Sequence, residues 1–160
     1  MTDTHLDVRR PRVLIAAPGD VIRLLKSVLS DEADIVGAQA HDEAIRLLHV
    51  EEPDLIIVCY AFDEMHPFRF LRYVREEREL HVPTILVRAL PVPLGKTQEA
   101  EIRESYRTLG VDEFFNLYEL EQRHGRIAGL QKFRDSVLNR LPLNVSDVNG
   151  ASLARPRGPQ

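Results

Sequence analysis

Leu55-Ile-Ile-Val-Cys-Tyr60, preceded by Pro53-Asp54, is the most hydrophobic stretch of this chain. Its β-branched residues and the turn-forming pair before it predict a strand. Because the run is continuously apolar rather than alternating, we expect this strand at the centre of a sheet that is covered on both faces. The rest of the fold is predicted by working outward from it.

Strand-like and helical patterns alternate on both sides of this stretch. The other expected strands are 12–17, 35–40, 82–88 and 111–115, and the expected helices are 21–29, 42–52, 68–74, 97–109 and 119–141. This alternation predicts an α/β fold with a doubly wound, five-stranded parallel sheet in the order 2-1-3-4-5 and helices on both faces, as in flavodoxin-like proteins. Gly125 and Gly129 each weaken the last helix by about 1 kcal/mol relative to alanine, which predicts a bend there.

Length and composition favour a single globular domain. The chain has 160 residues, of which 44% are hydrophobic and 29% charged. We expect the folded domain to span 11–141, with a flexible N-terminus at 1–10. The segment 142–160 is rich in Asn, Ser, Pro, Gly and Arg, so we expect a flexible C-terminal tail.

Several classes of function are disfavoured by what the sequence contains. The net charge of −4, with both signs interspersed, gives no basic face for nucleic acid. No apolar run approaches the ~18 residues that cross a membrane. The single cysteine and the polar N-terminus predict a cytoplasmic protein, and we find neither a Gly-x-Gly-x-x-Gly run nor a Walker-type lysine motif.

The run Glu52-Pro-Asp-Leu-Ile-Ile-Val58 resembles the third strand of response-regulator receiver domains of the CheY-like type. In that family Pro-Asp-Leu and three apolar residues lead to the aspartate that accepts phosphate. Met65-His-Pro67, Val82-Pro-Thr-Ile-Leu-Val-Arg-Ala89 and Leu109-Gly-Val-Asp-Glu-Phe-Phe115 extend the resemblance over 12–141, in the same order. It implies a receiver fold and a signalling role in a two-component phosphorelay.

The residues that carry out phosphorylation in the family are replaced at every matching position. Ala17 and Pro18 stand where two acidic residues hold magnesium, and Cys59 stands at the phosphoacceptor. Arg88 replaces the hydroxyl residue that ends the fourth strand, and Leu117 replaces the lysine that ends the fifth. The resemblance therefore implies a degenerate pseudo-receiver that is not an enzyme and needs no metal or cofactor.

Two residues invite more than one interpretation. Arg88 either fills the vacated cavity, paired with Asp20 or Asp63, or is an exposed arginine at a strand end. Cys59 is either a reactive thiol or, as we expect for a central strand, inert packing. Metal binding by the neighbouring Asp63, Glu64 and His66 is disfavoured, because polar loops commonly carry such residues without a ligand.

The receiver family uses one face for dimers and partner contacts. In this chain that face comprises helix 97–109, strand 111–115 and helix 119–141. The residues that we expect to contact a partner there are Pro91, Leu94, Tyr106, Phe114 and Tyr118. The alternative is that the aromatic residues among them belong to the core.

We therefore predict a stand-alone, phosphorylation-independent signalling module that binds another protein, or itself as a homodimer, and not nucleic acid or a membrane. One alternative is a receiver that is still phosphorylated, on Asp63. Another is a small-molecule binder or enzyme, which requires an open pocket above Ala17, Cys59 and Arg88.

Overall fold

The computed structural model describes residues 9–142 of the chain. Nearly all of the predicted flexible segments, 1–10 and 142–160, lies outside the described residues. Arg9 and Arg10 are part of the folded domain: the first pairs with a carboxylate at the start of the third strand, and the second donates to backbone oxygens after the first helix.

The strands and helices follow one another in near-regular alternation. The strands are β1 (Arg12–Ala16), β2 (Asp34–Ala38), β3 (Leu55–Cys59), β4 (Thr84–Arg88) and β5 (Glu113–Asn116). The helices are α1 (Gly19–Leu29), α2 (His41–Val50), α3 (Phe62–Met65), α4 (Pro67–Arg72), α5 (Lys96–Arg107), α6 (Leu117–His124) and α7 (Arg126–Arg140), with a π-helical turn η2 (Tyr73–Glu77).

The five strands form one parallel sheet in the order β2-β1-β3-β4-β5, which confirms the predicted topology. Every residue of β3 and β4 is buried. Continuous apolar character is what a central strand covered on both faces requires, and this explains why the sequence predicted the middle of the sheet well.

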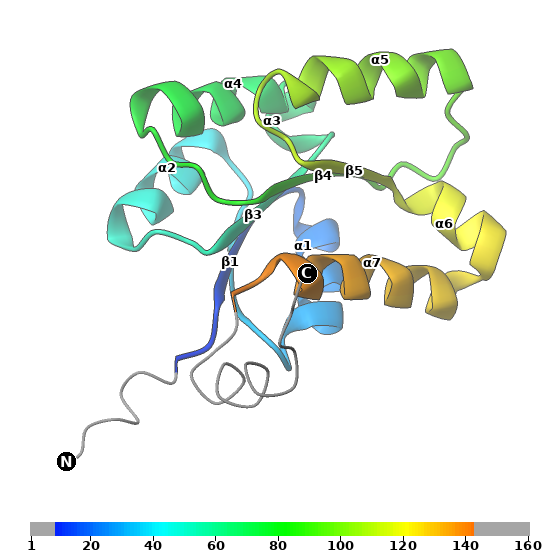
Figure 1. Cartoon of the computed structure of the whole chain (residues 1–160), viewed down its shortest axis with the longest axis horizontal. Coiled ribbons are helices and arrows are strands. Elements are labelled where there is room, and N and C mark those ends of the chain that lie inside the picture. Colours follow the sequence, from blue (N-terminus) through cyan, green and yellow to red (C-terminus); the bar gives the residue numbers. More distant parts are fainter. Residues whose placement is uncertain (1–8, 143–160) are drawn as a thin grey trace, which may run out of the picture.

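Helices cover both faces of the sheet (Figure 1). Leu14 and Ala16 of β1 belong to the core cluster with α2, α4, η2 and α5, whereas Val13 and Ile15 belong to the cluster with α1 and α7. Alternate residues of a strand point to opposite faces, so each strand contributes to both clusters. The carboxyl ends of the strands, where ligands bind in such sheets, meet at one edge of this sandwich.

The segment that follows β3 departs from simple helical geometry. Asp63, Glu64 and Met65 have left-handed backbones, with φ of 57°, 54° and 71°. A left-handed conformation costs about 1–2 kcal/mol for each residue that is not glycine. The predicted helix 68–74 is present as α4, and it widens into η2 after Arg72.

The predicted long helix 119–141 is two helices that meet at Gly125. Gly125 has φ 87° and ψ 164°, a region that only glycine occupies readily. At Gly129 a Cβ atom would lie 2.9 Å from the backbone oxygen of Leu120, so α7 packs directly against the backbone of α6. The glycines therefore do more than weaken a helix: they build a corner, which Figure 1 shows where α6 meets α7.

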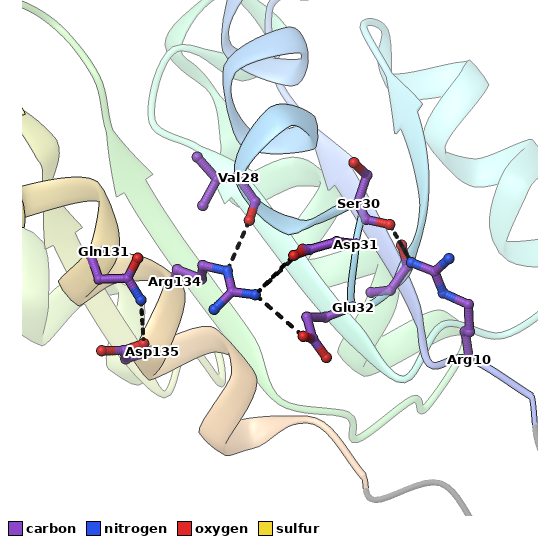
Figure 2. A network of polar contacts seen from close by, with 9 residues as sticks. Arg10, Val28, Ser30, Asp31, Glu32, Gln131, Arg134 and Asp135 are labelled. Carbon is purple, nitrogen blue, oxygen red and sulfur yellow. Dashed lines mark hydrogen bonds and ion pairs between the residues drawn. The ribbon is translucent and has the colours of Figure 1, made fainter. Parts of the chain in front are cut away.

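A polar clamp holds α7 to the end of α1 (Figure 2). The Arg134 Nε donates to the backbone oxygen of Val28 at 3.2 Å, and its Nη2 lies 3.3 Å from Asp31 and 3.4 Å from Glu32. The guanidinium thus satisfies a carbonyl in the last turn of α1, where a positive charge also complements the helix dipole.

Candidate functional site

The two residues of the loop after β1 carry no carboxylate, although Asp20 in the next turn lies near enough for its charge to act on Cys59. Ala17 is fully buried, and Pro18 is the residue before α1, where it offers no side-chain cap. Asp20 lies in the first turn of α1 and is exposed. The two residues that match the magnesium ligands of receiver domains therefore supply no side-chain oxygen.

Cys59 ends β3 and is 1% exposed. It packs in the cluster that α1 and α7 cover, together with Ala17 and Leu117. Burial raises the pKa of the Cys59 thiol, and hydrogen bonds from the backbone of Ala61 and Ala89 offset part of this effect. The side chain is thus a neutral, enclosed thiol rather than a nucleophile.

Arg88 ends β4 and is 4% exposed, so it is not the solvent-exposed arginine that was one of the two interpretations. Arg88 lies on the opposite face of the sheet from Cys59. Leu86 shares the face of Arg88 on β4 and packs in the cluster of α2, α4 and α5, whereas Cys59 packs in the cluster of α1 and α7. The Nη1 atom donates to the backbone oxygen of Val92 at 2.8 Å. This bond ties the guanidinium to the loop between β4 and α5.

The predicted pairing of Arg88 with Asp20 or Asp63 is not formed. Among residues 9–142, no carboxylate oxygen lies within 4.0 Å of an Arg88 nitrogen. Asp63 instead accepts two hydrogen bonds from Arg69, from Nε at 2.9 Å and from Nη2 at 3.1 Å. The left-handed turn carries Asp63 toward α4, which sequence spacing did not reveal.

Leu117 begins α6 and is buried in the same cluster as Cys59. In receiver domains the matching residue is a lysine. An apolar side chain here leaves this end of the sheet without that cation. Three of the replaced positions, Ala17, Cys59 and Leu117, belong to one buried apolar cluster, and we call these three residues the apolar layer.

A cavity of about 480 Å³ opens beside this layer, between the loops that follow β1, β2 and β3. Its lining includes Gly19, His41 and Asp63, but not Ala17, Cys59 or Arg88. The small-molecule alternative requires an open pocket above those three residues. The observed cavity lies instead toward α2 and α4.

Two of the charged groups that line this cavity, Asp63 and Arg69, are paired with each other. The hydrogen bond from Arg69 holds the pKa of Asp63 below its usual value, so the carboxylate stays ionised and engaged. Burial, followed by the charge of Arg69, lowers the pKa of His41, although Asp63 and Asp42 act in the opposite direction. The Asp63 carboxylate is thus engaged with Arg69, whereas the buried Nδ1 of His41 has no hydrogen-bond partner among the described residues.

The predicted partner face is only partly available. Tyr106 and Phe114 are buried, and Tyr106 packs edge-on against Tyr60 at 6.2 Å between ring centres. Burial raises the pKa of Tyr106 to about 12. These two residues are therefore core residues and not contact residues, whereas Pro91 is exposed and Leu94 and Tyr118 are half-buried.

Sequence reasoning missed two features of this region. Arg69 was not recognised as the partner of Asp63, because the two residues meet only through the left-handed turn. Ile127 was not recognised as a surface residue, although it is 87% exposed on α7. In the sequence, Ile127 directly follows Gly125 and Arg126. A glycine and a charged residue at the start of a helix could have indicated that the next residue is exposed.

Residues 9–142 contain neither a cluster of metal-ligating side chains nor a membrane-spanning helix. No group of three or more His, Cys, Asp and Glu side chains is arranged to hold a metal ion. Within the same part of the chain, no helix combines the length and apolar character that crossing a membrane would require.

Comparison with known proteins identifies the fold. No protein-family model matches the sequence, and no curated protein matches it. The structure is similar to the chemotaxis protein CheY4 of Vibrio cholerae (TM-score 0.61, 16% identity, 83% of this chain and 100% of that one). It is also similar to the receiver domain of the Francisella response regulator 1452 (TM-score 0.56, 19% identity, 77% and 98%). A third similar structure is the BeF₃-activated N-terminal receiver domain of Klebsiella pneumoniae RstA (TM-score 0.51, 18% identity, 65% and 82%). The chain therefore has the fold of response-regulator receiver domains.

Proposed function

We propose that this chain is a receiver-like module of two-component signalling that binds another protein without being phosphorylated. The observation that carries the proposal is the apolar layer formed by Ala17, Cys59 and Leu117 at the carboxyl edge of the sheet. A cytoplasmic location belongs to the same proposal, since a single buried thiol suits a reducing compartment.

Phosphoryl transfer depends on charges that this layer lacks. The transferred group must be held by a divalent cation and received by a nucleophile, and catalysis is almost entirely positioning and electrostatic stabilisation. Ala17 offers no oxygen ligand, and the buried Cys59 thiol is held neutral by its raised pKa. Asp63, the alternative acceptor, has each carboxylate oxygen bonded to Arg69.

The test is exposure of the full chain to beryllofluoride or acetyl phosphate in the presence of magnesium. We expect no added phosphoryl mass and no change in the amide NMR spectrum. The RstA receiver domain serves as the positive control, because it has been obtained in a BeF₃-activated form. Asp63→Asn is the matched variant: phosphate on the wild-type chain that is lost in this variant would establish Asp63 as an acceptor and refute the proposal.

We propose that binding uses the exposed part of the predicted face. Tyr106 and Phe114 are buried, so they are left out of it. The remaining surface comprises the loop between β4 and α5, with Pro91 and Leu94, and the neighbouring helices α6 and α7 with Tyr118. The buried Arg88 holds this loop to the end of β4, because it donates a hydrogen bond to the backbone oxygen of Val92.

A further inference from the structure

A small cavity lies at the corner between α6 and α7. Its volume is about 170 Å³, and we call it the corner cavity. The apolar side chains that line it come from α1, from the loop after β4, and from both helices of the corner: Leu24, Pro91, Leu117, Leu120 and Leu130. An apolar cavity of about 150 Å³ is large enough for a benzene-sized group, so this one accommodates a branched aliphatic side chain.

The residue best suited to enter such a cavity stands beside it. Ile127 is 87% exposed, and it lies one helical turn before Leu130, which lines the corner cavity. The loop on the other side of the cavity also exposes Leu90 and Val92. Ile127, which we call the knob, thus lies within one helical turn of a residue that lines an apolar cavity.

The charged rim of the cavity is complementary to itself. Glu121 and Arg126 both line it, and within the chain they lie 3.7 Å apart with exposed side chains. An exposed ion pair contributes little to stability, so exchanging the two partners between copies carries little cost. A two-fold arrangement that brings Glu121 of one copy to Arg126 of the other necessarily brings Arg126 of the first to Glu121 of the second.

We infer that two copies of the chain associate through this face, with Ile127 of each copy seated in the corner cavity of the other. This inference rests on the proposed function, because it identifies one partner as the chain itself and places the contact at the α6–α7 corner. A closed two-fold arrangement buries both knobs and both cavities, and leaves no exposed copy of either to continue into a fibre.

The first test replaces the knob. Light scattering and sedimentation of the full chain over a range of concentrations are expected to give a dimer, and Ile127→Gln should weaken it. Burial of one such side chain is worth about tenfold in an equilibrium constant, and each dimer buries two, so the dissociation constant should rise about a hundredfold. Val50→Gln is the matched control, because Val50 is 70% exposed on α2 and lies outside the proposed contact. It should leave the dimer unchanged.

The second test exchanges the charges. Glu121→Arg and Arg126→Glu should each abolish the dimer, since like charges then face each other across the axis. A mixture of the two variants should form a heterodimer, because each mixed contact again joins opposite charges. A pair that acts only within one chain would show no such rescue.

The outcomes separate this inference from the proposed function. A wild-type chain that stays monomeric, or a dimer that Ile127→Gln does not weaken, overturns the inference and leaves the corner cavity to a different protein. Neither result bears on phosphorylation, which the beryllofluoride experiment measures independently. Circular dichroism should show both Gln variants to be folded, because each replaced side chain is exposed in the single chain.

Discussion

Replacing Gly129 by alanine should destabilise the protein, although helix propensity alone predicts the opposite. Gly129 lies inside α7, where alanine is favoured over glycine by about 1 kcal/mol. The added Cβ, however, would lie 2.9 Å from the backbone oxygen and 3.0 Å from the carbonyl carbon of Leu120. Both atoms belong to the backbone of α6, so no side-chain rotation relieves the contact.

The magnitude follows from the difference between these two effects. Overpacking in a well-packed region costs about 1–3 kcal/mol. We place Gly129→Ala in the upper half of that range, because α6 is held by the buried Leu117 at its start and by Gly125 at its end. After the gain in helix propensity, the free energy of unfolding should fall by about 1–2 kcal/mol, which corresponds to a few degrees in Tm.

Urea unfolding followed by circular dichroism measures this change, with two reference variants. Ala128→Gly, at the exposed neighbouring position, should cost only the propensity difference of about 1 kcal/mol. Gly125→Ala should also destabilise, by about 1–3 kcal/mol, but through backbone strain, because no atom lies within 4 Å of the added Cβ. An increase in stability for Gly129→Ala would refute the close packing of α6 on α7.

Three further predictions concern single side chains. The Cys59 thiol should resist a disulfide reagent in the native protein and react fully after denaturation, since it is buried and its pKa is raised; rapid native reaction would contradict its burial. The lowered pKa of Asp63 contributes stability above the ordinary carboxyl pKa of about 3.9, and this contribution is lost as pH falls through the lowered value. Asp63→Asn should therefore be less stable than the wild type at neutral pH, and the gap in urea midpoint should close in acid; a gap independent of pH would exclude the bond from Arg69 as its source. Arg134→Met should lower the free energy of unfolding by about 1–2 kcal/mol, because it removes the charged donor at the end of α1, and equal midpoints for the two proteins would show that the clamp is dispensable.

The sheet could be predicted because its signal is local and repeated. The apolar run 55–60 and its counterparts fix which segments are strands, and the alternation with helices then restricts the topology to very few arrangements. The structure agrees with the strand order and with helices on both faces. Element ends were less certain: β5 runs over Glu113–Asn116, two residues later than Val111 at its start and one later than Phe115 at its end.

The candidate site could be predicted only in part, since its geometry depends on contacts between distant segments. Cys59 lies at the end of its strand and is buried, as its apolar neighbours indicated. No glycine marks the left-handed turn at 63–65, so local propensity gave no indication of the contact between Asp63 and Arg69. Tyr106 is the converse case: its amphipathic helix has a buried face, and sequence alone did not identify which aromatic residues lay on it.

The proposed independence from phosphorylation and the proposed contact surface share one residue, Leu117. Leu117 stands where receiver domains have a lysine, and it contributes both to the buried layer beside Cys59 and to the lining of the corner cavity. A lysine at this position would have to bury its ammonium among leucines or displace the first turn of α6, and an unpaired buried charge is far more costly than an apolar side chain. Since α6 also supplies Leu120 and Glu121 to the corner cavity, the apolar residue at 117 takes part in the packing that forms this cavity. Leu117 therefore supports both proposals, a sheet edge that is not phosphorylated and a surface that contacts another chain.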